Sequence, residues 1–180
     1  TAIGIKDSVV DLGSGDDWAT ISAWAGGADP TAIGLKGDGS PKSILDTGSE
    51  DDSVRINVGA NGWNWWGGGP KSTAIGIDNY EVDLGSGNDE LSIDAWAAGA
   101  NPTAIGIKDS VVDLGSGDDR AYISANTRDN TYWDPAIGLQ NTSLLTGSGR
   151  DDLYIYASAS GEEGILEATG LKGDGSPKSI

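Results

Sequence analysis

The chain has 180 residues, with 28 Asp and Glu against 11 Lys and Arg, and its formal net charge is −17 at pH 7. Because nucleic acids and anionic membrane surfaces bind basic faces, this charge argues against both as partners. The chain contains no Cys and no His, which excludes disulfides, thiolate metal sites and imidazole chemistry and leaves oxygen ligands of the kind that Ca²⁺ or Mg²⁺ prefer.

Internal repetition is the strongest pattern in the chain. The segment Thr1–Asp17 recurs letter for letter at Thr103–Asp119, and Gly37–Ile44 recurs at Gly173–Ile180. Such repeats cannot bury an apolar face alone and are typical of stacked solenoid coils. We therefore interpret residues 1–180 as one solenoid segment, a fragment of a longer repeat protein or filament. Its coils are expected to begin near Thr1, Thr31, Thr73, Thr103, Ala136 and Ala168.

Three short strands are predicted in each coil. The first reads AIGI or AIGL, the second runs from Ser8 to Leu12 in the first coil, and the third alternates apolar and polar residues with a period of two. We expect an all-β, right-handed parallel β-solenoid of about five to six coils. In the second strand the residues interpreted as equivalent are Val10, Leu45, Val82, Val112 and Leu145.

Variable loops are expected on one edge, after the third strand. Their lengths differ while the strands keep their spacing, as insertions at one corner of a solenoid do. The predicted loops are Trp24–Pro30, Gly59–Ser72, Trp96–Pro102, Asn126–Pro135 and Ser158–Glu167.

An acidic corner follows the second strand, with the pattern Gly-Ser-Gly-Asp-Asp in the first coil. Stacking would repeat its carboxylates every ~4.8 Å, where two charges repel by about 0.9 kcal/mol in water and about 3.5 kcal/mol at an effective dielectric constant near 20. A divalent cation between corners would remove this repulsion. The candidate metal ligands are Asp16, Asp17, Asp51, Asp52, Asn88, Asp89, Asp118, Asp119, Asp151 and Asp152.

A simpler interpretation of these aspartates is a set of turns in which the carboxylate accepts backbone hydrogen bonds without any metal. A second acidic column, formed by Asp11, Asp46, Asp83 and Asp113, is expected on an outward position. It is interpreted as a solvated face, with counter-ion binding or a contact to Lys of a neighbouring chain as the alternative.

The acidic corner resembles the nonapeptide G-G-x-G-x-D-x-U-x of the repeats-in-toxin, or hemolysin-type calcium-binding, proteins. Gly13, Gly15, Asp17 and Ala19 fall on its second Gly, third Gly, Asp and apolar positions. The first Gly is replaced, by Leu12 in the first coil, and each coil has one such turn where the family has two. The wider repeat is similar to long repetitive surface proteins of cyanobacteria. The resemblance implies Ca²⁺ between stacked turns, and a secreted or cell-surface location.

Tryptophans near the variable loops are candidate contacts for a partner or a glycan, because exposed aromatic rings can stack on sugars or on another chain. Packing within the molecule is the alternative. These residues are Trp24, Trp63, Trp65, Trp66, Trp96 and Trp133.

The sequence predicts a structural or assembly protein of a surface layer, sheath, adhesin or filament. Copies of itself are the expected partners, with cell-surface polysaccharide as a further candidate. We expect no enzyme, because the acidic pairs repeat identically whereas an active site breaks symmetry, and no membrane insertion, because no run of about 18 apolar residues occurs. The alternatives are a carbohydrate-binding adhesive module that uses the Trp-rich loops and the repeat region of a secreted polysaccharide-active enzyme.

Overall fold

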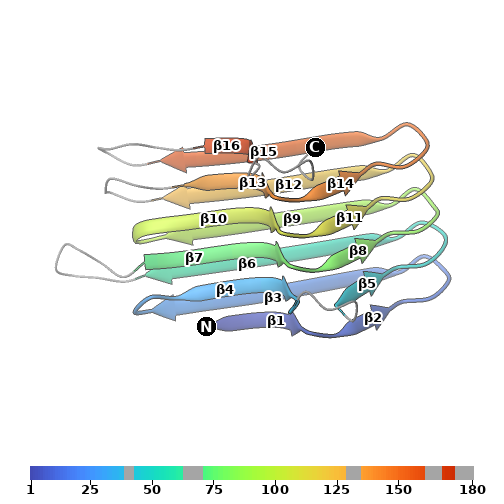
Figure 1. Ribbon diagram of the computed structural model, residues 1–180. Coiled ribbons are helices and arrows are strands. Elements are labelled where there is room, and N and C mark those ends of the chain that lie inside the picture. The colour runs from blue at the N-terminus through green and yellow to red at the C-terminus, as the bar shows by residue number, and fades with distance from the viewer. Residues whose placement is uncertain (39–42, 63–70, 129–134, 161–167, 173–180) are drawn as a thin grey trace.

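The computed structural model describes residues 1–38, 43–62, 71–128, 135–160 and 168–172. All the regular secondary structure within these ranges is β-strand, and all the strand pairs are parallel. The strands stack from β1 at one end to β16 at the other (Figure 1). The expected all-β parallel solenoid is therefore confirmed. No helix of the described residues is long and apolar enough to cross a membrane.

Three parallel sheets form the sides of the solenoid, and each of the first five coils contributes one strand to each sheet; β16 adds a sixth strand to the first sheet. The first sheet contains β1 (Ala2–Lys6), β4 (Thr31–Lys36), β7 (Lys71–Asp78), β10 (Ala100–Lys108), β13 (Ala136–Gln140) and β16 (Ala168–Lys172). The second contains β2 (Val9–Asp11), β5 (Ile44–Asp46), β8 (Glu81–Asp83), β11 (Val111–Asp113) and β14 (Ser143–Leu145). The third contains β3 (Trp18–Gly27), β6 (Ser53–Gly62), β9 (Glu90–Ala98), β12 (Arg120–Arg128) and β15 (Asp152–Ser160).

Like residues of successive coils pair in register. In the third sheet Ile21 pairs with Ile56, and Ile56 pairs with Ile93. The same column continues to Ile123 and Ile155. The repeat therefore sets which strands are neighbours, because only this register places every apolar column on the inner face.

The core is narrow and filled by apolar columns from all three sheets. Val54, Ile56 and Val58 of β6 are almost completely buried, while the intervening Arg55 is exposed. Glycine in the first sheet makes room for this packing, since a Cβ at Gly76 would lie 2.4 Å from Cγ2 of Ile93 and 2.4 Å from the carbonyl oxygen of Gly106.

The second strand of the fifth coil corrects one sequence assignment. Val112 pairs with Leu144, and Leu145 pairs with Asp113. Leu144 is 8% exposed and Leu145 is 45% exposed. The expectation that Leu145 is equivalent to Val112 was wrong, because two adjacent leucines hide the register of the strand.

The third strands extend further than predicted. β3 continues through Trp24 to Gly27, and β9 continues through Trp96 to Ala98. Both tryptophans therefore lie on strands rather than in variable loops. Trp24 is 65% exposed, and its ring occupies the space over Gly59 of the next coil, where a Cβ would lie 2.2 Å from ring atoms. The extension arises because backbone pairing with the neighbouring coil continues past the core-facing residues.

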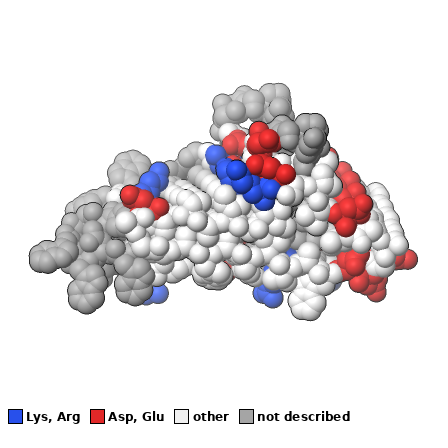
Figure 2. Space-filling view, turned by 90° about the horizontal axis from the view of Figure 1, so that it is seen from below, with Lys and Arg blue, Asp and Glu red and all other residues white. Residues whose placement is uncertain are grey.

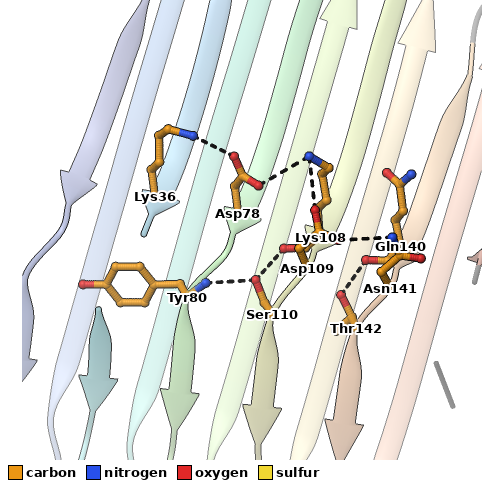
Figure 3. A network of polar contacts seen from close by, with 9 residues as sticks. All are labelled: Lys36, Asp78, Tyr80, Lys108, Asp109, Ser110, Gln140, Asn141 and Thr142. Atoms are coloured by element: carbon orange, nitrogen blue, oxygen red, sulfur yellow. Dashed lines mark hydrogen bonds and ion pairs between the residues drawn. The ribbon is translucent and has the colours of Figure 1, made fainter. Parts of the chain in front are cut away.

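A column of charged residues lies at the C-terminal ends of strands β4, β7 and β10. Lys36, Asp78 and Lys108 occupy paired positions, and the buried Asp78 carboxylate lies 2.9 Å from Lys36 Nζ and 3.7 Å from Lys108 Nζ (Figure 3). Lys108 also contacts Asp109 at 3.3 Å. One aspartate inserted between stacked lysines therefore offsets the repulsion that would otherwise act between them.

Candidate functional site

The turn between the second and third strands is itself stacked in register. Ser14, Ser49, Ser86, Ser116 and Ser148 form successive parallel bridges at this corner. The residues on either side of the serines have positive φ, for example 82° at Gly85 and 146° at Gly87. Glycine adopts this conformation without strain, which explains its repetition in the corner.

An inner column of aspartates connects each coil to the next. The carboxylate Oδ1 of Asp89 accepts a hydrogen bond from the Asp52 backbone N–H at 2.8 Å, and Oδ1 of Asp119 accepts one from the Asp89 N–H at 2.9 Å. The same contact recurs along the edge. We call this set the inner column: Asp17, Asp52, Asp89, Asp119 and Asp151.

An outer column of side chains runs beside the inner column, and its hydrogen bonds to the backbone point in the opposite direction along the stack. Here the side chain belongs to the preceding coil: Asp51 Oδ1 accepts from the Asn88 N–H at 2.7 Å, and Asn88 Oδ1 accepts from the Asp118 N–H at 2.9 Å. The outer column consists of Asp16, Asp51, Asn88, Asp118 and Arg150, and all five are exposed. Two hydrogen bonds of opposite direction therefore clamp the coils together. Figure 2 shows acidic side chains gathered at this edge, on the right of the view.

In four of the five inner-column aspartates the second carboxylate oxygen has no hydrogen-bond partner. Oδ2 of Asp17, Asp52, Asp89 and Asp119 is shielded from solvent and accepts no hydrogen bond. Asp52, Asp89 and Asp119 are 3%, 2% and 0% exposed as whole residues. An ionised carboxylate in this position is costly unless a proton or a cation compensates it.

Burial changes the acidity of the inner column. It raises the pKa of Asp89 to about 6, although the hydrogen bond from the Asp52 N–H acts in the opposite direction, and the charges of Asp119 and Asp52 add to the rise. Burial also raises the pKa of Asp119, with a smaller contribution from Asp151. The column therefore favours uptake of positive charge.

The predicted ligands divide between these columns, with one exception. Asp152 lies outside both, because it begins β15, pairs with Arg120 and places a carboxylate oxygen 3.6 Å from Arg120 Nε. Arg150 takes the outer-column position in the fifth coil. A hollow of about 390 Å³ at this end of the edge is lined by Asp118, Asp119, Arg120, Arg150, Asp151 and Asp152.

Carboxylates do not converge in threes at this edge. No group of three or more His, Cys, Asp or Glu side chains close enough to hold a metal occurs in the part of the chain that the structure describes. A cation between coils would therefore draw on two inner-column carboxylates and complete its shell with backbone carbonyl oxygens and water, both of which Ca²⁺ accepts.

The second acidic column is confirmed in register: Asp11 pairs with Asp46, Asp46 with Asp83, and Asp83 with Asp113. Oδ1 of Asp83 and of Asp113 each accepts a hydrogen bond at 3.0 Å from the backbone N–H two residues later. These two carboxylates therefore brace the start of the corner. Burial raises the pKa of Asp46, and the charges of Asp83 and Asp11 raise it further.

The candidate aromatic contacts are described in part. Trp24 and Trp96 lie on the outer face of the third sheet, whereas Trp63, Trp65, Trp66 and Trp133 lie outside the described residues. Sequence reasoning missed Trp18, which is 77% exposed at the start of β3. Its position directly after Asp17, one residue before the inward Ala19, marks it as outward-facing.

Comparisons with protein-family models, with curated proteins and with solved structures gave no match.

Proposed function

We propose that this chain is an extracellular structural solenoid of the hemolysin-type calcium-binding kind, in which Ca²⁺ bound along the inner column stiffens the stack. The observation that carries the proposal is the row of shielded Oδ2 atoms without a hydrogen-bond partner. These atoms recur at four of the five inner-column positions, so one kind of ligand would serve most of the edge.

Calcium suits this row for two reasons. It accepts carboxylate, carbonyl and water oxygens in a flexible shell of six to eight ligands, and the glycine-rich corner supplies carbonyl oxygens beside the carboxylates. The pairs Asp52 with Asp89 and Asp89 with Asp119 would hold it. When bound, the ion would neutralise buried negative charge and bridge two coils.

Location and assembly follow from the same chemistry. A chain with a net charge of −17 repels itself, and millimolar calcium outside the cell would neutralise the corners there. A surface layer, sheath, adhesin or filament is the proposed setting. The role is structural rather than catalytic, since the acidic groups repeat from coil to coil and an active site requires a unique constellation.

Copies of the same chain are the proposed partners. Near-identical coils pair in register within the chain: β10 is paired on both sides, with β7 and with β13. The coil that contains β10 repeats the sequence of residues 1–17 at residues 103–119. The same pairing would join coils of separate copies, since exposed strand edges favour strand addition.

Calorimetry tests the metal directly. Titration of the chelator-treated protein with Ca²⁺ at pH 7.5 is expected to release heat and to raise the melting temperature, since a ligand that binds only the folded state stabilises it. Circular dichroism is expected to show more β structure with Ca²⁺ than with chelator. No heat, an unchanged melting temperature and equal β content would refute the proposal.

A carbohydrate-binding adhesive module is the second candidate, favoured by the exposed ring of Trp24. Glycan-array binding that is lost in Trp24→Ala would support it. The repeat region of a secreted polysaccharide-active enzyme is the third candidate, which a catalytic domain elsewhere in the same gene product would support.

A further inference from the structure

A hollow of about 250 Å³ lies on the outer face of the third sheet, away from the acidic corner. Trp18, Ser53 and Glu90 are paired residues of β3, β6 and β9 in one outward column. The small Ser53 between the larger Trp18 and Glu90 leaves the hollow open. Arg55 and Ser92, two residues further along their strands, complete its lining.

The walls of this hollow differ in chemistry. Trp18 offers an aromatic ring that is 77% exposed. Facing it are a carboxylate, a guanidinium and two hydroxyl groups. Neither the Arg55 nor the Glu90 side chain takes part in a hydrogen bond or ion pair within the described part of the chain. These groups are therefore available to a ligand.

We propose that this hollow binds one sugar ring of a neutral polysaccharide. The apolar face of a pyranose ring can stack on indole, which is a large rigid surface with low entropy cost. Its hydroxyl groups can donate to Glu90 and accept from Arg55, and hydrogen bonds to charged groups are the stronger kind. Because the two charges cancel, the hollow has no preference for a phosphorylated or sulfated ligand.

The surrounding face suits a long chain rather than a single sugar. Trp24 lies on the same outward side of β3, six residues after Trp18, which places it ~20 Å away at about 3.3 Å per residue. It is also exposed, and the bare Gly59 beneath it lets its ring lie against the sheet. A polymer laid along β3 and β6 would meet an aromatic ring at each end.

Binding to named probes tests this site. The full chain is mixed with microcrystalline cellulose, chitin or granular starch, and retained protein is measured; cellohexaose, chitohexaose and maltohexaose are then titrated while tryptophan fluorescence is recorded. At least one probe is expected to bind. Trp18→Ala and Arg55→Ala are each expected to weaken that binding about tenfold, the usual cost of losing a central contact.

Tyr154→Ala is the matched control, because Tyr154 is an exposed aromatic residue of the same sheet face, on β15 and outside the hollow. It is expected to bind like the wild type. Circular dichroism confirms that each variant is folded. All titrations are repeated in chelator and in Ca²⁺, so that failure of the calcium proposal is seen separately.

Three results would overturn the inference. The first is retention of no probe, and the second is undiminished binding by Trp18→Ala. The third is self-association of the wild type in sedimentation velocity that Trp18→Ala abolishes without any probe, which would assign this face to contacts between copies of the chain.

Discussion

Asp52, Asp89 and Asp119 of the inner column hold their two carboxylate oxygens in different environments. Oδ1 of Asp89 receives the Asp52 backbone N–H, whereas Oδ2 is shielded and unpartnered. The side chain thus has a structural role through one oxygen, whereas the other oxygen has no partner and could bind a cation. Substitutions can separate these roles.

Asp89→Asn and Asp89→Ala are predicted to differ. Asparagine keeps an oxygen that can accept the Asp52 N–H and removes the buried charge, so the calcium-free protein should be as stable as the wild type or more so. Alanine leaves that buried N–H without an acceptor and should cost about 1–3 kcal/mol. Urea unfolding in chelator measures both, and equal loss in the two variants would contradict the assignment.

Stability is also expected to depend on pH through the carboxyl group of Asp89. The folded-state pKa of Asp89 is raised from 3.8 to about 6. Between these two pH values the folded protein therefore holds a proton that the unfolded chain has released. The resulting stability is complete below about pH 4 and is lost as the pH rises through about 6. It amounts to about 3 kcal/mol at most. The raised pKa values of Asp46 and Asp119 act in the same direction.

In chelator, the melting temperature is therefore expected to be higher at pH 5 than at pH 7.5. Asp89→Asn should flatten this dependence, since the variant lacks the titrating group. A wild-type protein that is more stable at pH 7.5 than at pH 5 would show that the inner column is compensated in some other way.

Backbone conformation at Glu50 supports a third prediction. Glu50 has φ of 79°, at the corner position that Gly15, Gly87 and Gly117 occupy in other coils. A side chain in this region is strained. Glu50→Gly is expected to increase the free energy of unfolding by about 1 kcal/mol. Ser49→Gly, a change at the neighbouring position without positive φ, serves as the control and should not stabilise.

At the scale of the strand, the glycine column of the first sheet limits the width of the core. Gly76→Ala would place a Cβ 2.4 Å from Ile93 Cγ2 and from the Gly106 carbonyl oxygen. It is expected to destabilise by about 1–3 kcal/mol, as overpacking does. Gly26→Ala is the control, because its nearest contact would be an ordinary 3.7 Å. Thermal melts that fail to separate the two variants would contradict this packing.

Strand identity and register could be predicted from the sequence because the repeat is nearly literal. The Ile21 column and the second acidic column are both found as the letters imply. The error at Leu145 was avoidable: Val112 stands three residues before Gly115, and Leu144 stands three residues before Gly147. Glycine spacing was the better guide where two leucines are adjacent.

The site was less predictable than the fold. Stacked corners follow from the repeat, but the sequence does not specify that the inner and outer side chains bond in opposite directions. Glycine spacing does place Asp152 opposite Arg120, five residues after Gly147 and Gly115 respectively, but it does not specify the ion pair between the two side chains. Side-chain direction depends on the local turn, which one-dimensional periodicity does not encode.

At the scale of the whole molecule, the acidic edge opposes the packing of the three sheets. Apolar columns and parallel hydrogen bonds hold the coils together, while the net charge of −17 and the aligned carboxylates act against stacking. Cation binding would relieve this opposition at every coil. The molecule is thus proposed to be a scaffold whose rigidity depends on its ionic surroundings.

Crystals grown with Ca²⁺ would locate any bound calcium through an anomalous difference map recorded at long wavelength. A row of peaks is expected between the Oδ2 atoms of successive inner-column aspartates, at Asp52, Asp89 and Asp119. A map without peaks along this edge, or with peaks only among the exposed outer-column side chains, would contradict this expectation.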